Sequence, residues 1–211
     1  MLRISELSCE RDDRILFHDL NYEFPKGKII QLEGQNGSGK TTLLRILSGL
    51  YGSFSGSIFW KEAPIDSVKI EFKHNLLFIG HKSAIKLNLT PIENLKFLIG
   101  LHQFFTEDEL YEALDRVGLF GFEQVMCRNL SAGQQRRVAL ARLYLSNASV
   151  WILDEIFTAI DKEGVAQLEH FLSEKAQSGV TIILTTHHQL SLSDYLVLNL
   201  GHFHQQDERV E

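Results

Sequence analysis

Hydrophobic and polar residues alternate near the start of the chain. Within residues 2–7 and 20–24, apolar side chains recur at every second or third position. This spacing is typical of half-buried strands, so we expect an opening antiparallel sheet. The next apolar run, KIIQLEG (residues 28–34), predicts a buried strand. It is followed by a glycine-rich turn and then by TTLLRILSGL, whose apolar residues have helical spacing. The pattern therefore predicts a strand, a loop and a helix in succession.

The middle of the chain has the pattern of an insert made of helices. Thr90, Pro91 and Glu93 combine an N-cap, a proline at the first helical position and the acid of a capping box. The same box pattern recurs from Thr106 to Glu109, again before apolar residues at helical spacing. We therefore expect residues 90–147 to be mostly helical.

Strand-like apolar runs return in the last third of the chain. They cover residues 149–155, 180–187 and 195–200, with helical spacing between the first two. Alternating strands and helices indicate an α/β fold with a parallel sheet. The chain shows no internal repeat and no long linker, so we expect one domain with subdomains.

Composition narrows the class of protein. The 211 residues are 44% hydrophobic and 23% charged, as in an ordinary globular domain. A net charge of −6 argues against a broad nucleic-acid-binding surface. No apolar stretch approaches the roughly 20 residues that cross a bilayer, and the charged start lacks a signal peptide, which predicts a cytosolic chain. Cys9 and Cys127 form no CxxC motif and are expected to be reduced, structural thiols.

The segment GQNGSGKTT, residues 34–42, fits the phosphate-binding pattern GxxxxGK[ST] between a predicted strand and a predicted helix. Small residues let successive main-chain N–H groups face an anion, and the helix N-terminus adds about half a positive charge. Lys40 would reach the β- and γ-phosphates of ATP, and Thr41 would bind Mg²⁺. A glycine-rich turn without a ligand is the minor alternative. The predicted phosphate-binding residues are Gly34, Asn36, Gly37, Ser38, Gly39, Lys40, Thr41 and Thr42.

The strand VWILDE delivers two adjacent carboxylates to its C-terminal end, the edge at which open α/β sheets bind ligands. We expect Asp154 to complete the Mg²⁺ site with Thr41, and Glu155 to act as the general base for the attacking water. Alone, a buried strand that ends in two acids can have a purely structural explanation. Because the chain also carries Lys40 in a phosphate-binding motif, the purely structural explanation becomes the minor one.

LSAGQQRR, residues 130–137, places a serine and a glutamine in a capping box, so it predicts a helix N-terminus with free N–H groups. Alone, the pattern would fit any capped helix. The segment closely resembles the LSGGQ signature of ABC ATPases, with Ala132 in place of the first glycine. The residues that match the signature are Ser131, Ala132, Gly133 and Gln134.

The resemblance to ABC ATPases extends over nearly the whole chain. TAID, which ends at Asp161, looks like the D-loop, and TTH places His187 at the switch histidine, with His188 as an adjacent alternative. The resemblance implies a P-loop NTPase fold with an N-terminal antiparallel β subdomain, and a homodimer in which ATP lies between Lys40, Asp154, Glu155 and His187 of one copy and Ser131 and Gly133 of the other. It divides the single domain into a core (residues 1–80 and 148–211) and a helical subdomain (81–147).

Two positions depart from the general ABC pattern. His81 stands at or near the position where many relatives have the Q-loop glutamine. Relatives also commonly stack an aromatic residue on adenine, whereas this chain offers Arg11 or Arg14 and then Phe17. An arginine can stack on a base, so the adenine contact stays open between these residues.

The opening LSCERDDRILF and the segment IGHKSAIKLNLTPIENLKF look like those of the ATP-binding subunit of the bacterial cytochrome c maturation, or haem exporter, complex. This resemblance implies a peripheral ATPase on the cytoplasmic face of the inner membrane, a multi-pass permease as partner, and an indirect link to a haem chaperone. We interpret the tail HFHQQ as exposed residues without a ligand role. The alternatives are another small ABC exporter, a soluble ABC ATPase of DNA repair or translation, and a regulator that does not hydrolyse ATP.

Overall fold

The computed structural model describes residues 1–99 and 105–203. The contacts divide the chain into two compact units. The core unit comprises Met1–Phe78, Ala148–Glu155 and Glu169–Glu211, and the helical unit comprises Ile79–Asn147 and Ile156–Leu168. Of the tail HFHQQ, residues 204–206 lie outside the described residues.

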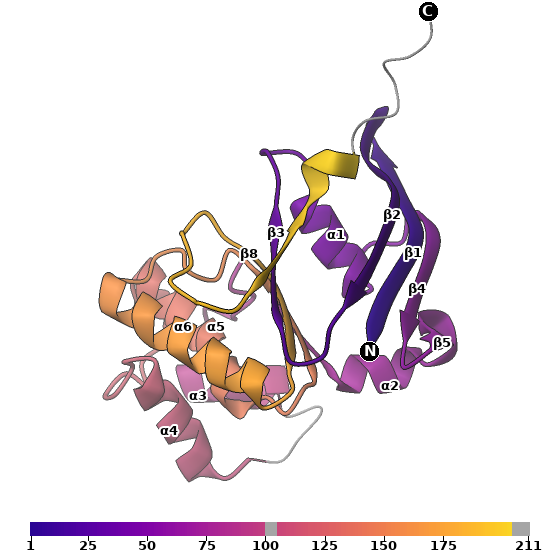
Figure 1. The fold of residues 1–211 in the computed structure, drawn as a ribbon. Coiled ribbons are helices and arrows are strands. Elements are labelled where there is room, and N and C mark those ends of the chain that lie inside the picture. The colour runs from indigo at the N-terminus through magenta and orange to yellow at the C-terminus, as the bar shows by residue number, and fades with distance from the viewer. Residues whose placement is uncertain (100–104, 204–211) are drawn as a thin grey trace, which may run out of the picture. The chain divides into compact units, whose positions relative to one another are not determined.

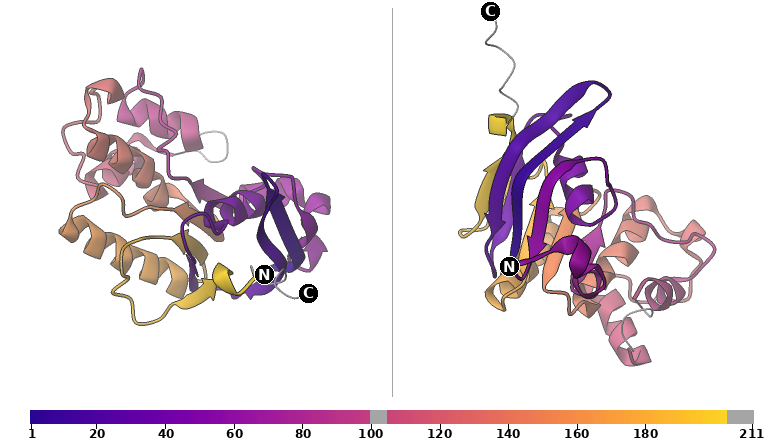
Figure 2. Two further views of the ribbon diagram at one scale, coloured as in Figure 1. Left: turned by 90° about the horizontal axis from the view of Figure 1, so that it is seen from above. Right: turned by 90° about the vertical axis from the view of Figure 1, so that its right-hand side faces the viewer.

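The opening of the chain forms the antiparallel sheet that the alternating pattern predicts. Its four strands have the order β2-β1-β4-β5. Leu2 lies opposite Phe24 and Ile4 opposite Tyr22, which places the buried residues of β1 and β2 on one face. Figure 2 shows these two strands side by side as a long ribbon. The strands are β1 (Leu2–Arg11), β2 (Arg14–Phe24), β4 (Ser55–Trp60) and β5 (Ala63–Pro64).

The second sheet has five strands in the order β6-β7-β8-β3-β9. The pairs β7–β8, β8–β3 and β3–β9 are parallel, as the alternation of strands and helices predicts. Every residue of β7 and of β8 is buried, as expected for strands covered on both faces. The strands are β6 (Leu76–Ile79), β7 (Val150–Asp154), β8 (Thr181–Thr185), β3 (Ile29–Glu33) and β9 (Leu196–Asn199).

Helix α1 (Lys40–Leu47) lies between β3 and the antiparallel sheet (Figure 1). Its leucine and isoleucine side chains are buried in one hydrophobic cluster with residues of both sheets. Trp151 of β7 packs against Phe171 of α6, with ring centroids 6.0 Å apart. The remaining short elements of the core unit and helix α6, which begins in the helical unit, are η1 (Ile65–Ser67), α2 (Lys69–His74), α6 (Lys162–Gln177) and η3 (Leu200–Phe203).

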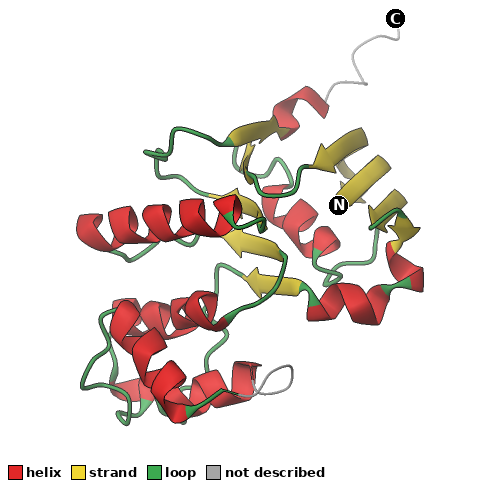
Figure 3. Cartoon of the chain, turned by 60° about the horizontal axis from the view of Figure 1, so that its bottom comes forward, coloured by secondary structure: helices red, strands yellow, loops and turns green. Residues whose placement is uncertain are grey.

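The helical unit contains α3 (Pro91–Ile99), α4 (Glu107–Arg116), η2 (Cys127–Asn129) and α5 (Ala132–Leu145). Leu95, Leu114 and Val138 are fully buried in the cluster that joins the three α-helices. In Figure 3 these helices form a red cluster at the lower left. Both predicted capping boxes are present: the main-chain N–H of Glu93 donates to Thr90 Oγ1 and that of Glu109 to Thr106 Oγ1. The prediction of a mostly helical insert is confirmed for the described residues.

Both cysteine thiols are buried and free in the structure. Burial raises the pKa of the Cys127 thiol, so it stays protonated at neutral pH. None of the helices in residues 1–99 and 105–203 combines the length and the hydropathy that crossing a bilayer requires.

Asn94 is a fully buried polar residue in α3 that holds the segment preceding its helix. Its Nδ2 donates to the carbonyl oxygens of Lys86 (3.0 Å) and Thr90 (3.0 Å), and its Oδ1 accepts from the N–H of Lys86 at 2.7 Å. One buried amide therefore ties the main chain of Lys86 to the start of α3.

We expect Asn94→Ala to lower the free energy of unfolding by about 2–3 kcal/mol, because it removes the hydrogen bonds of a fully buried amide and leaves a cavity in its place. The matched control is Gln124→Ala, at an exposed amide that donates to Tyr111 Oη, which should cost no more than about 0.5 kcal/mol. Urea unfolding followed by circular dichroism measures both. Equal effects of the two substitutions would contradict a structural role for Asn94.

Candidate active site

The loop between β3 and α1 depends on its glycines. Gly34, Gly37 and Gly39 have φ angles of 147°, 83° and 92°, which side chains disfavour. A Cβ at Gly34 would lie 2.5 Å from Ser38 Oγ, and one at Gly39 would lie 3.0 Å from Leu16 Cβ. The loop can therefore keep this course only with glycine at both positions.

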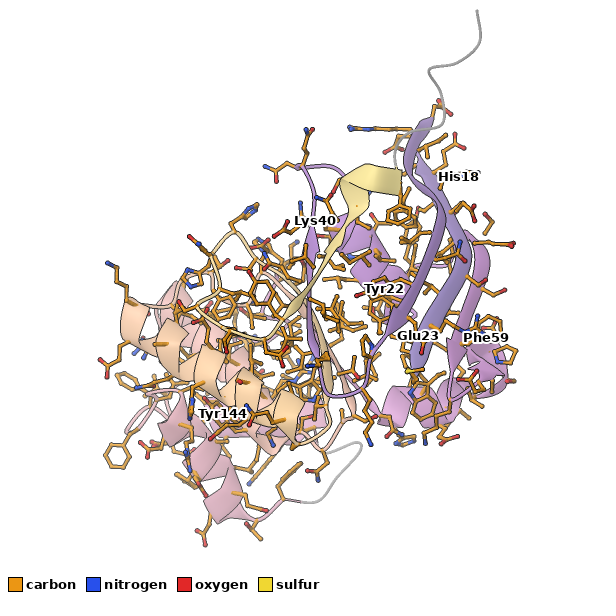
Figure 4. The ribbon with its side chains drawn as sticks, viewed as in Figure 1. His18, Tyr22, Glu23, Lys40, Phe59 and Tyr144 are labelled. Carbon is orange, nitrogen blue, oxygen red and sulfur yellow. The ribbon has the colours of Figure 1, made fainter. Side chains whose placement is uncertain are left out.

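Lys40 (labelled in Figure 4) lies where the loop enters α1. Its Nζ donates to the carbonyl oxygens of Gly34 (2.6 Å) and Gln35 (3.1 Å), so the ammonium group is held over the loop. Among the described residues, the buried Ser38 Oγ has no hydrogen-bond partner. The cation, the unsatisfied hydroxyl and the helix N-terminus converge here, an arrangement that fits a phosphate group. Asn36 lies on the exposed part of the same loop, and Thr42 follows Thr41 in the first turn of α1.

Asp154 ends β7 and is only 2% exposed. Its Oδ1 accepts a hydrogen bond from Thr185 Oγ1 at 2.6 Å and lies 3.4 Å from Thr41 Oγ1. The structure thus brings the carboxylate and the hydroxyl of the predicted metal site together. Oxygen donors of this kind are what Mg²⁺ prefers.

Glu155 lies directly after the strand, in the left-handed region with φ 54°. Its N–H donates to Thr185, at 3.1 Å to both the carbonyl oxygen and Oγ1, which fixes the turn. The carboxylate Oε1 lies 3.6 Å from Nε2 of His187, whose side chain is 72% exposed. The predicted base and the predicted switch histidine are therefore neighbours at one end of the sheet.

His188, the alternative to His187, faces a different group. Its Nε2 lies 3.4 Å from Oε1 of Glu169, a buried residue of α6. The structure thus separates two adjacent histidines that the sequence pattern alone left undecided: Nε2 of His187 lies beside Glu155, and Nε2 of His188 lies beside Glu169.

In the helical unit, the predicted signature segment begins α5. Ser131 is the N-cap, and its capping box with Gln134 is present in both directions, at 3.2 Å and 2.9 Å. Ala132 is exposed in the first turn, so its methyl group meets no steric obstacle there. A Cβ at Gly133 would lie 3.3 Å from the carbonyl oxygen of Ala159, so a side chain here would require a small shift of that carbonyl group.

Two arginines that the sequence reasoning did not single out follow the signature. Buried Arg136 donates from Nη1 to the carbonyl oxygens of Gly80 (2.8 Å) and His81 (3.2 Å). Arg137 Nη2 lies 2.7 Å from Oδ2 of Asp161. Helix α5 is therefore linked to the main chain of the predicted Q-loop position and to the predicted D-loop. The imidazole of His81 remains exposed.

Asp161 caps the start of α6, where its Oδ1 accepts from the N–H of Gly164 at 2.8 Å. This hydrogen bond, followed by the charge of Arg137, lowers the pKa of the Asp161 carboxyl, so it is ionised at neutral pH. The predicted D-loop thus ends in a negative charge that is paired with the helix of the predicted signature.

The three candidates for the adenine contact differ in their burial and in the groups they contact. Phe17 is fully buried and packs beneath Gly39, so it cannot stack on a base, and this part of the sequence expectation is wrong. Arg11 pairs with its neighbour Asp12 at 3.3 Å. The guanidinium of Arg14 lies 3.6 Å from the position that a Cβ would take at Gly37, next to the phosphate loop.

The fold and the site together define an ATP-binding cassette. A model of the ABC transporter family matches residues 17–158, which include the phosphate loop, the signature and the acidic strand end. Two solved structures have the same fold. One is a putative ABC transporter ATP-binding protein from Pyrococcus furiosus, with a TM-score of 0.82, 26% identity and coverage of 97% of this chain and 99% of that one. The other is a dimeric bacterial ABC transporter cassette, with a TM-score of 0.80, 21% identity and 95% of each chain covered.

Relatives of higher identity specify the branch of the family. Cytochrome c biogenesis ATP-binding export proteins CcmA from Hahella chejuensis and Aliivibrio fischeri are 50% and 52% identical, over 92% and 90% of this chain and 92% and 93% of theirs. That of Pseudomonas fluorescens is 49% identical over 96% of this chain and 97% of its own. The chain belongs to the ABC transporter family and, within it, to the cytochrome c biogenesis ATP-binding export proteins. It is an ATPase whose hydrolysis is coupled to transport.

We expect Gly34→Ala to weaken ATP binding by at least about tenfold, because the added Cβ displaces Ser38 and tilts the loop N–H groups away from the phosphates. Isothermal titration with ATP measures the change. The control is Gly52→Ala, since no described atom lies within 4 Å of a Cβ built there. Equal affinities of the two variants would contradict the steric argument.

Proposed function

We propose that this chain binds MgATP in its phosphate loop, hydrolyses it as a homodimer, and drives a cytochrome c biogenesis and haem-handling export complex at the bacterial inner membrane. The observation that carries the hydrolytic part is the 3.6 Å approach of His187 to Glu155, next to the buried carboxylate of Asp154. The names of the CcmA relatives support the biological part.

Binding of the triphosphate rests on the loop and on Lys40. The main-chain N–H groups of residues 34–42 and the Lys40 ammonium hold the β- and γ-phosphates, and the unsatisfied Ser38 hydroxyl supports this assignment. Thr41 Oγ1 and Asp154 would hold Mg²⁺, which neutralises charge on the phosphates when bound. Within the described residues no cluster of three or more His, Cys, Asp or Glu side chains could hold a metal.

Glu155 acts as the general base in this proposal. Its carboxylate is 19% exposed, so it can reach a water molecule at the open end of the sheet while its main chain stays anchored to Thr185. The attacking water gives its proton to this carboxylate. The largely exposed His187 lies 3.6 Å from Glu155 and would hold the γ-phosphate and the base in line.

The signature residues act on the ATP of a second copy. Ser131, Ala132, Gly133 and Gln134 lie at the N-terminus of α5, where free N–H groups and the helix dipole favour an anion. Asp161, fixed by Arg137, belongs to the D-loop of the same interface, and His81 takes the Q-loop position. The dimeric form in which a cassette of the same fold was solved agrees with this arrangement.

The proposed partner is a multi-pass membrane permease, with a haem chaperone linked indirectly. The chain would lie on the cytoplasmic face of the inner membrane as a peripheral subunit, and the helical subdomain predicted for residues 81–147 would transmit the nucleotide-dependent motion. No nucleic acid takes part, in agreement with the net charge of −6.

We expect two substitutions to separate binding from hydrolysis. Lys40→Ala should weaken ATP binding by about ten- to a hundredfold, because it removes a charge-assisted contact. Glu155→Gln should bind ATP normally, hydrolyse it at least about a hundredfold more slowly, and persist as a dimer. Isothermal titration measures ATP binding, phosphate release measures hydrolysis, and light scattering with MgATP measures dimer formation. Lys61→Ala, at an exposed lysine, is the control. Wild-type turnover by Glu155→Gln would remove Glu155 as the base.

The export assignment is tested by purifying the tagged full chain from its own membranes in mild detergent. Mass spectrometry should find a small multi-pass protein and a haem-binding chaperone, and the visible spectrum should show haem. An unrelated permease would leave the ATPase intact and refute the haem assignment. Recovery of no membrane protein would favour an ABC ATPase that is not tied to transport.

A further inference from the structure

Glu169 is a buried carboxylate that the proposed hydrolytic mechanism does not use. Its side chain is 7% exposed, and it lies on α6 between the buried residues Leu168 and Leu172. A carboxylate is seldom buried unless hydrogen bonds compensate its lost hydration. The contacts of Glu169 therefore indicate which part of the structure it stabilises.

Both contacts lead to the loop between β8 and β9. Glu169 Oε1 accepts a hydrogen bond from the main-chain N–H of Ser191 at 3.0 Å and lies 3.4 Å from Nε2 of His188. A buried Leu190 lies between these two loop residues. One carboxylate oxygen on a helix thus binds the loop at two points that are three residues apart.

The same loop carries His187. Two hydrogen bonds fix the start of this loop. Thr185 Oγ1 donates to Asp154, and the N–H of His188 donates to Thr186 Oγ1 at 2.8 Å. With His188 directed to Glu169, the adjacent His187 lies beside Glu155 instead, at 3.6 Å. The side chain of His187 is too exposed for its own packing to fix it.

We infer that Glu169 is a positioning residue for ATP hydrolysis: through His188 and the N–H of Ser191 it holds the β8–β9 loop in the register that presents His187 to Glu155. The inference rests on the proposed roles of Glu155 and His187. It adds a buried group that touches neither the nucleotide nor the reacting water, and it gives His188 a role distinct from that of His187.

Turnover is the first test, measured on the full chain. Glu169→Ala should lower kcat by about ten- to a hundredfold, because a shift of about 1 Å in a catalytic side chain has effects of this size. The dissociation constant for ATP should stay within about twofold, since the phosphate loop is untouched. Glu169→Gln keeps an acceptor oxygen for the Ser191 N–H and should retain most of the activity.

The same helix offers a matched control. His170 and Glu174 form an exposed pair at 3.3 Å, with the same residue types on the surface of α6. Glu174→Ala should leave kcat unchanged. In a double-mutant cycle, His188→Ala combined with Glu169→Ala should lose little more activity than either single variant. Fully additive losses of activity in the two single variants would contradict the proposed coupling between Glu169 and His188.

Hydrogen exchange tests the inference without relying on turnover. In Glu169→Ala, peptides that cover residues 186–194 should exchange faster, while phosphate-loop peptides and the Glu174→Ala protein should match the wild type. Unchanged exchange in the loop would overturn the inference, as would an equal loss of ATP affinity and kcat. If Glu155→Gln turns over ATP normally, the proposed catalytic roles fail, and the exchange result still decides whether Glu169 holds the loop.

Discussion

The site depends on the hydrogen bonding of the buried Asp154 carboxylate. Asp154 ends a strand whose five residues are all buried, and it is stabilised by the hydroxyl of Thr185 at 2.6 Å, with Thr41 Oγ1 at 3.4 Å. A charge in this position requires polar groups to surround it. Two such groups come from β8 and α1, so the requirement aligns the phosphate loop, the acidic strand end and the loop after β8.

Local signals explain why much of this could be predicted from the sequence. A glycine-rich segment between a buried strand and an amphipathic helix has few alternative conformations, and Gly34 and Gly39 occupy φ values and close contacts that exclude other residues. The capping boxes at Thr90, Thr106 and Ser131 are similarly complete within four residues. Where the contacts that determine a conformation lie within one turn of the chain, the sequence pattern predicts the structure.

Other features depend on residues far apart in the sequence, and no local pattern contains them. Phe17 has the residue type of an adenine contact, yet the packing of β2 under Gly39 buries it. Arg136 binds carbonyl groups 55 and 56 residues earlier in the chain. Two neighbouring histidines after β8 look equivalent in the sequence, and the carboxylates that face them, one directly after β7 and one on α6, distinguish them.

The helical unit shows how two adjacent side chains can connect three functional segments. Arg136 and Arg137 are neighbours on α5, but one is buried against the main chain at Gly80 and His81 and the other pairs with the D-loop at Asp161. A guanidinium donates in several directions within one plane, so each arginine fixes the segment it faces without a flexible intermediary. Any displacement of the signature helix must therefore either carry both segments with it or break these contacts. This arrangement makes the predicted Q-loop, signature and D-loop positions mechanically dependent on one another, although the three motifs are separate in the sequence.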